Sequence, residues 1–268
     1  MCRSDFLTGI SLALRARYLL QGFCSLLVLA LAVLLAAQFS GRQSGAVALD
    51  VGLSVMRLLL PLALVLMTQE LLSREFERRY FLNSLTYPRS RHGLLLGRFL
   101  SVCVLTASLL LVMALLLAAL VWLVGQGDAK GASIALDHHY LVTIFFFGLD
   151  LLLLASLACL LAVVASTPSF VLIGTFGFML AARSFSAIVE LLNRDASVVG
   201  DAESYRAGVG LLGYLLPDLG ALDIRMVALY GKMDFLPVDW PWLLLSNLAY
   251  VVGLLALAVW ALQRKRFA

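Results

Sequence analysis

Long apolar runs separated by short polar stretches dominate the sequence. Six of these runs are long enough to cross a bilayer, whose hydrocarbon core of about 30 Å requires roughly 20 helical residues. Aromatic residues lie near several of the run ends, as is typical of membrane interfaces. The pattern therefore predicts an all-α polytopic membrane protein formed as one transmembrane domain over 1–268, with six transmembrane helices at about 18–38, 47–68, 94–124, 140–165, 170–190 and 242–263.

Composition supports this prediction and sets the orientation. The chain is 62% hydrophobic and only 13% charged, against roughly 25% charged residues in soluble domains. The N-terminal arm, the stretch 69–98 and the C-terminal tail carry twelve of the 20 Lys and Arg residues. Because positive charge collects on the cytoplasmic side, we expect both termini and this stretch to be cytoplasmic. We therefore read the net charge of +4 as a topology signal, and we expect no nucleic-acid partner.

A few ionisable residues fall inside the predicted helices, where an unpaired charge is costly. Arg57 and Asp150 each lie ten residues in from the outer end of a predicted span, which is about 15 Å deep at 1.5 Å per residue. We expect these two to pair, either as a structural clip between helices or as a polar element of the substrate path. Arg183, Glu190 and Asp50 lie closer to the outer surface, so we expect their side chains to extend toward water.

The cytoplasmic stretch 69–98 reads QELLSREFERRYFLNSLTYPRSRHGLLLGR and contains nine charged residues. Its apolar residues recur at nearly helical spacing, with charged residues on the other faces, which predicts an amphipathic helix at the membrane surface. Tyr87-Pro88 is expected to end that helix, because a residue before proline disfavours the helical region. A simple positive anchor is one interpretation, but it accounts only for the arginines.

This stretch resembles the cytoplasmic loop of type-2 ABC export permeases. The likeness includes a span that ends in Glu, an E-x-E pattern, a Pro-x-Ser-Arg turn and a Gly-Arg pair entering the next span, here Glu70, Glu75, Phe81, Leu82, Leu85, Pro88, Ser90, Arg91, Gly97 and Arg98. The six-span layout is also similar, so the likeness extends over essentially the whole chain. One departure is Glu77-Arg78-Arg79-Tyr80, where the family often has Gly-Thr or Gly-Ser.

The resemblance implies a permease subunit in the bacterial inner membrane, driven by a separate ATPase. This chain has no G-x-x-x-x-G-K-[ST] phosphate loop, so we expect no cofactor on it, with ATP and Mg bound by two ATPase copies. The expected partners are these ATPases, membrane lipids and a second permease copy, in a homodimer or, alternatively, a heterodimer. The loop 69–93 would contain a coupling helix, and 1–17 an interfacial helix. The residues expected to dock on the ATPase are Glu70, Arg74, Glu75, Phe76, Glu77, Arg79, Tyr80, Phe81, Leu82, Pro88, Ser90 and Arg91.

The segment 191–241 is the longest stretch between predicted spans and is net acidic, which is consistent with an external position. It contains two apolar stretches that are too short to cross a bilayer, separated at Pro217-Asp218. We expect short re-entrant helices, which in the resembling family form an external gate, here around Tyr214, Pro217 and Asp218. A surface amphipathic helix is the alternative.

No catalytic or metal-binding set emerges from the sequence. His138 and His139 are adjacent, and His92 is predicted on the opposite side of the membrane. The four cysteines lie near the N-terminus or inside apolar runs and read as apolar fillers. We therefore predict an exporter permease for a substrate that is lipid-like or hydrophobic. An ATP-independent carrier, a scaffold of an envelope complex and a membrane-embedded enzyme are the alternative interpretations.

Overall fold

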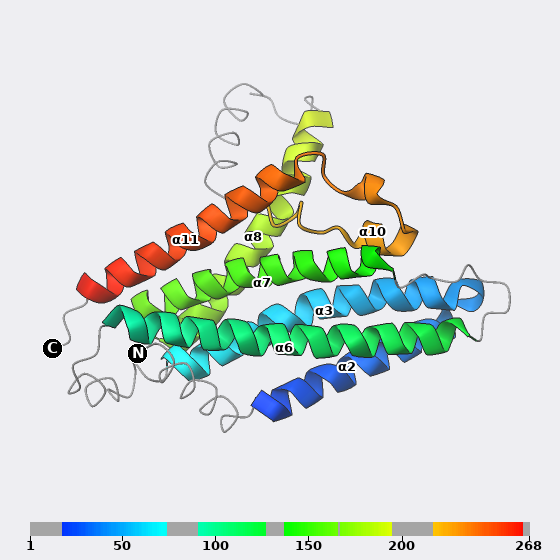
Figure 1. The fold of residues 1–268 in the computed structure, drawn as a ribbon, viewed down its shortest axis with the longest axis horizontal. Helices are drawn as coiled ribbons and strands as arrows, with labels where there is room; N and C mark the ends of the chain where they lie inside the picture. Colours follow the sequence, from blue (N-terminus) through cyan, green and yellow to red (C-terminus); the bar gives the residue numbers. More distant parts are fainter. Residues whose placement is uncertain (1–17, 74–90, 127–136, 166, 195–216, 265–268) are drawn as a thin grey trace.

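The computed structural model describes residues 18–73, 91–126, 137–165, 167–194 and 217–264, with 42, 73, 91 and 185–194 described as backbone only. In this part of the chain every regular element is a helix (Figure 1). The long helices are α2 (Tyr18–Phe39), α3 (Ser44–Thr68), α6 (Arg91–Gly125), α7 (His138–Val164), α8 (Pro168–Arg194) and α11 (Trp240–Arg264). Short elements are the 3-10 turns η1 (Gly41–Gln43) and η4 (Met233–Phe235), the π-helical turn η2 (Gln69–Ser73) and the helix α10 (Arg225–Tyr230).

The six long helices coincide with the six predicted spans to within about four residues at each end. Five of them are long and apolar enough to cross a membrane. In α8, the described apolar stretch Pro168–Ser184 is shorter than the others, so the all-helical membrane fold is confirmed while the count of six spans remains a prediction.

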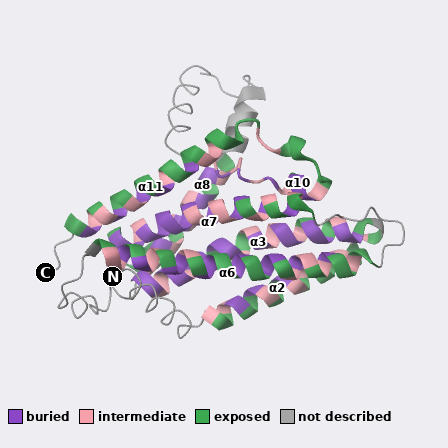
Figure 2. Cartoon of the chain, in the orientation of Figure 1, coloured by how far each residue is buried: buried purple, intermediate pink, exposed green. Residues whose placement is uncertain are grey.

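α3 and α7 lie in the centre of the bundle, and the other helices surround them (Figure 2). Leu53, Met56, Leu64, Leu153 and Leu154 are fully buried in this centre. The outer helices α2 and α11 instead expose many leucines and aromatic residues, as expected for surfaces that face lipid. The apolar runs thus divide into two central helices covered by protein and peripheral helices covered by membrane.

A glycine permits a close approach between α3 and α6. A Cβ added to Gly52 would lie 2.2 Å from a methyl carbon of Leu117 and 3.1 Å from one of Val33 on α2. Small residues at helix contacts in membranes let backbones approach closely. Gly52 therefore fixes the contact of α2, α3 and α6 on one side of the core.

Residues 217–224 and α10 fold back against α3 and α7. Leu219, Leu222 and Ile224 are almost fully buried there. The sequence predicted a short helix through this stretch, but 217–224 form turns and only Arg225–Tyr230 is helical. Within these turns the carboxylate of Asp218 accepts a hydrogen bond from the backbone N–H of Ala221 at 2.9 Å, a local side-chain contact of the kind that Asp makes in turns and at helix starts.

Candidate functional site

An ion pair between α3 and residues 217–230, the described part of the segment that the sequence predicts to be external and hereafter the external segment, lies at the centre of the polar contacts. The Arg57 guanidinium pairs with the carboxylate of Asp223. A second nitrogen of Arg57 donates to the carbonyl of Leu219 at 3.2 Å. Arg57 is only 14% exposed, so its charge requires a partner inside the protein. These contacts hold 217–224 against α3 at the depth of Arg57.

Arg225, the first residue of α10, extends this set of contacts toward the N-terminal end of α3. Its Nε donates to Asp223 at 2.8 Å, and another of its nitrogens donates to the hydroxyl of Ser54. The carboxylate of Asp50 lies 3.7 Å from the same guanidinium and is half-exposed. The external segment is thus attached to α3 over two turns, from Asp50 to Arg57.

A second ion pair joins the neighbouring helices α7 and α8. The guanidinium of Arg183 pairs with the carboxylate of Asp150, which is almost fully buried. Arg183 also donates to the backbone carbonyl of Arg57 at 3.3 Å. The two pairs therefore touch, and together they connect α3, α7, α8 and the external segment.

The contact of Arg183 with the Arg57 carbonyl has a cause in the sequence. In an α-helix that carbonyl accepts from the N–H of the residue four positions later, which is Pro61 and has no N–H. A carbonyl without a donor is costly in a membrane, and neighbouring helices commonly supply one. Arg183 on α8 supplies the hydrogen-bond donor that Pro61 on α3 lacks.

These contacts correct two sequence predictions. Arg57 and Asp150 were expected to pair with each other, but Arg57 pairs with Asp223 and Asp150 with Arg183. Arg183 was expected to reach outward to water, yet it is 17% exposed and points into the bundle. The matched depth of Arg57 and Asp150 put them in one polar region. Depth alone does not show which face of each helix a residue occupies. Asp223 was not considered as a partner because its segment was predicted to lie outside the membrane.

The other predicted site residues are only partly described. Pro217 and Asp218 lie at the start of the buried turn, whereas Tyr214 lies outside the described residues. Asp50 is half-exposed, as expected, near the N-terminal end of α3, which the sequence predicts to face outward. The side chain of Glu190 is not described.

At the opposite end of the bundle, α3 continues into η2. Here Gln69 donates from its side-chain amide to the carbonyl of Pro168 at 2.7 Å. Leu71 and Leu72 are buried. Of the residues predicted to contact an ATPase, Glu70 lies in η2 and Arg91 begins α6; Arg74, Glu75, Phe76, Glu77, Arg79, Tyr80, Phe81, Leu82, Pro88 and Ser90 lie outside the described residues, as does the predicted interfacial helix 1–17.

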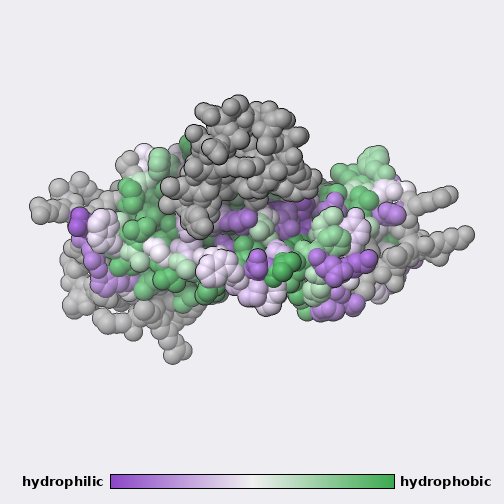
Figure 3. Space-filling model, turned by 90° about the horizontal axis from the view of Figure 1, so that it is seen from above, coloured by the Kyte–Doolittle hydropathy of each residue, from purple (hydrophilic) through white to green (hydrophobic). Residues whose placement is uncertain are grey.

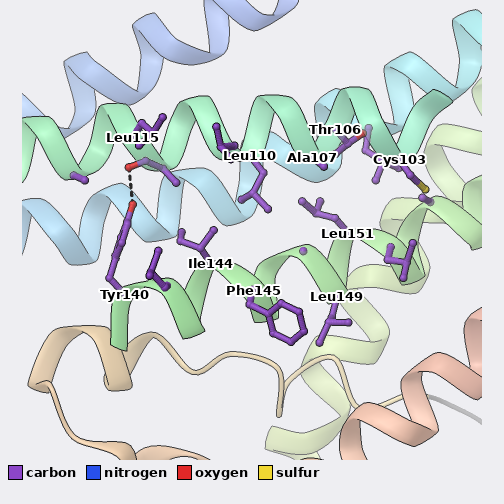
Figure 4. Close-up of a pocket in the computed structure, with 18 residues that line it drawn as sticks. Cys103, Thr106, Ala107, Leu110, Leu115, Tyr140, Ile144, Phe145, Leu149 and Leu151 are labelled. Carbon is purple, nitrogen blue, oxygen red and sulfur yellow. Dashed lines mark hydrogen bonds between the residues drawn. The ribbon is translucent and has the colours of Figure 1, made fainter. Parts of the chain in front are cut away.

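A groove of about 660 Å³ lies between α6 and α7 (Figure 4). Leu110, Leu115, Ile144 and Phe145 are among its apolar lining residues, and Tyr140 closes one end by donating its hydroxyl to the carbonyl of Ala114 at 2.7 Å. Its volume lies within the roughly 300–1,000 Å³ of typical ligand pockets. With this lining the groove is suited to hydrocarbon rather than to a charged group.

Polar and apolar surfaces alternate on the face that carries α8, α10 and α11. Seen from above, hydrophilic residues lie in the middle of this face as well as toward its ends (Figure 3). Arg57, Arg183 and Asp223 retain 14–20% exposure of their side chains. The ionic contacts are thus largely but not completely enclosed by the described part of the chain.

Comparison with known proteins places the chain in a family. No curated protein matches it. Residues 14–184 match the ABC-2 family transporter proteins, a range that includes α2, α3, α6, α7 and the described apolar part of α8 and amounts to more than half of the 268 residues. Together with the apolar helices long enough to cross a membrane, this match shows that the chain belongs to the ABC-2 family of membrane transporter proteins.

Proposed function

We propose that this chain is the membrane-spanning subunit of an ATP-driven exporter. It functions with a separate ATPase, in an assembly of two permease and two ATPase copies. ATP and Mg bind to the ATPase, because the chain has no phosphate loop of its own. Both termini lie in the cytoplasm, and the membrane is the bacterial inner membrane.

The observation that carries the proposal is the attachment of the external segment to the spans. Residues 217–224 are non-helical backbone packed among helices at the depth of Arg57. Such backbone is tolerated within a membrane protein where it is enclosed by protein or lines a cavity. Ion pairs to α3 hold it in place, so this arrangement supports the assignment of the segment as a closed external gate.

The gate is suited to controlled opening because its attachment is ionic. The three arginines Arg57, Arg183 and Arg225 are balanced by Asp50, Asp150 and Asp223. When the segment moves outward, water entering beside these groups solvates them and offsets the lost ion pairs. An apolar seal offers no such compensation in water, so charged contacts keep the energy difference between the closed and open arrangements small.

The energy for this movement enters through the loop 69–93. Its Glu and Arg residues set the register on the ATPase, while Phe76, Tyr80 and Phe81 serve as apolar anchors. Closure of the ATPase on ATP draws the two coupling helices together. That movement alternates the access of the transport path between its two sides.

The cargo is lipid-like or hydrophobic. The apolar lining of the groove between α6 and α7 supports this choice of cargo class. Cargo leaves the cytoplasm or the inner leaflet and passes the external segment. The polar contacts at the gate are also suited to a cargo that carries a polar end on an apolar body.

Purification of the tagged protein from its native membranes in mild detergent tests the proposal. We expect an ATPase subunit to co-purify with the parent chain, and Glu75→Lys or Phe76→Ala to reduce its recovery. Asp234→Lys provides a matched control, because it makes the same kind of charge change on the predicted outer side, where Asp234 is exposed. Equal recovery of the ATPase from the loop variants and the control, or no ATPase with the parent, contradicts the proposal.

A further inference from the structure

Two polar contacts link α8 to α3 and to η2, which continues α3: Gln69 of η2 donates to the carbonyl of Pro168, and Arg183 of α8 donates to the carbonyl of Arg57. Gln69 and Arg57 lie on either side of Pro61 along the chain. We propose that α8 connects the cytoplasmic loop to the external segment, with Gln69 and Arg183 as the positioning residues of this connection. The inference rests on the proposed function, because it identifies the route by which the loop acts on the gate. It follows from three sets of contacts.

The first contact lies at the base of the loop. Gln69 directly follows α3 and donates to the carbonyl of Pro168, the first residue of α8, at 2.7 Å. Gln69 belongs to η2, which packs against α3, α6, α7 and α8 at once. Wide π-helical turns of this kind occur frequently at functional sites. A displacement of the loop therefore acts on the start of α8 through this hydrogen bond.

The second contact lies 15 residues further along α8, about 22 Å away at 1.5 Å per residue. There Arg183 pairs with Asp150 and donates to the carbonyl of Arg57. Arg57 in turn holds Asp223 and the carbonyl of Leu219 in the external segment. The guanidinium of Arg183 on α8 therefore contacts Arg57, the residue that pairs with Asp223 in the external segment.

Between the two contacts, α8 is tightly packed on α7. A Cβ added to Gly174 would lie 2.9 Å from a methyl carbon of Leu161. The described side chains of α8 pack mainly against α7 and much less against α3. The two polar contacts are therefore specific links to α3 from a helix that is otherwise held elsewhere.

α3 itself is the obvious alternative route, since it runs directly from Arg57 to Gln69. It is weakened between these residues because Pro61 removes the hydrogen bond to the Arg57 carbonyl. Prolines at such positions are the usual cause of helix kinks. α3 is continuous through Pro61 apart from this missing hydrogen bond. The link through α8 bypasses it, with Gln69 on the predicted cytoplasmic side of Pro61 and Arg57 on the predicted outer side.

Amide hydrogen exchange of the permease alone, in lipid nanodiscs, tests the connection without an ATPase. Gln69→Met keeps the length of the side chain and removes its N–H donor. We expect the amides in 217–224, which begin at Asp218 because Pro217 has no N–H, to exchange roughly two- to ten-fold faster in this variant, which corresponds to the loss of one hydrogen bond. Gln69→Asn withdraws the amide and is expected to change exchange in the same direction, which provides a second variant if the first folds poorly.

Two controls separate this effect from general loosening. Gln263 on α11 also carries an amide, within 3.4 Å of His92 at the same end of the bundle, and Gln263→Met is expected to leave exchange at 217–224 unchanged. Residues 40–44 join α2 to α3 at the end of the bundle opposite Gln69 (Figure 1), where η1 packs against α2 and α3, and they should keep their exchange rates in every variant. Unchanged exchange at 217–224 in both Gln69 variants, or an equal increase at 40–44, overturns the connection.

Pro61→Ala tests whether the route through α8 matters because α3 lacks one backbone hydrogen bond at Pro61. The substitution restores the N–H donor to the Arg57 carbonyl, which makes α3 a continuous route. We expect the effect of Gln69→Met on 217–224 to shrink in this background. An undiminished effect contradicts the role of α8 as the route across Pro61.

The same measurement with the co-purified ATPase distinguishes this inference from the proposed function. ATP is expected to change exchange at 217–224 in the parent complex, and Gln69→Met is expected to abolish that change while the ATPase stays bound. A response that survives Gln69→Met overturns the route through α8 and leaves the proposed function intact. A parent complex without any response to ATP overturns the proposed function and its use of this route.

Discussion

Removal of Asp223 is the perturbation with the most specific expected outcome. Asp223→Ala deletes the carboxylate that pairs with Arg57 and with Arg225, and leaves the Arg57 guanidinium largely enclosed with only the Leu219 carbonyl from the segment. Breaking a fully buried ion pair costs about 3–5 kcal/mol. Since Arg57 and Asp223 are 14% and 20% exposed, water reduces this cost, and we expect a loss of about 2–3 kcal/mol, in the range of a hydrogen bond to a charged group.

The double variant Arg57→Met/Asp223→Leu tests whether the cost of Asp223→Ala comes from leaving the Arg57 charge without its carboxylate. Replacing both members of a buried pair with apolar residues of similar size is often nearly neutral, so we expect it to cost less than Asp223→Ala alone. The assay is the free energy of unfolding of the purified protein in mixed detergent micelles, measured by tryptophan fluorescence. A loss below about 0.5 kcal/mol for Asp223→Ala, or a double variant at least as unstable as Asp223→Ala, refutes the argument.

Three further predictions follow from other contacts. Asp150→Ala leaves Arg183 without its carboxylate and should lower the free energy of unfolding by about 3 kcal/mol, whereas Asp150→Asn, which retains an acceptor, should cost less in the same assay. Gly52→Val forces α3 away from Leu117 and should cost about 1–3 kcal/mol by overpacking, while Gly177→Ala, where a Cβ meets nothing within 4 Å, should be neutral or slightly stabilising; equal costs would show that α3 and α6 do not approach at Gly52. Cysteines placed at Ser4 and Ser40 report topology, and an impermeant thiol reagent outside the cell should label only the cysteine at Ser40.

The spans were predictable because each depends on local information. An apolar run of about 20 residues in this chain has to be a helix, since a helix satisfies its backbone internally in lipid. Charged residues and prolines at the run ends then place the boundaries, as at Tyr18–Phe39 and Trp240–Arg264. The same local argument places Arg57 and Asp150 at one depth.

The partners of these charges were not predictable in the same way. Asp223 belongs to a polar stretch whose position depends on how far the chain folds back between helices. Its burial follows from the neighbouring Leu219, Leu222 and Ile224, which have to leave water together. Arg183 carried a signal that sequence reasoning missed, because Pro61 frees the carbonyl of Arg57 and a donor on a neighbouring helix is then required.

The central claim is that ATP bound on the cytoplasmic side changes the position of the external segment. Leu222 is almost fully buried, so Leu222→Cys, in a chain whose four native cysteines are replaced with serine or alanine, reports that segment directly. The measurement is the labelling rate of this cysteine by an impermeant maleimide in right-side-out vesicles that contain the ATPase, with and without ATP inside. We expect labelling to accelerate at least several-fold with ATP and to return to the ATP-free rate when Glu75→Lys is added; labelling that does not respond to ATP contradicts the account.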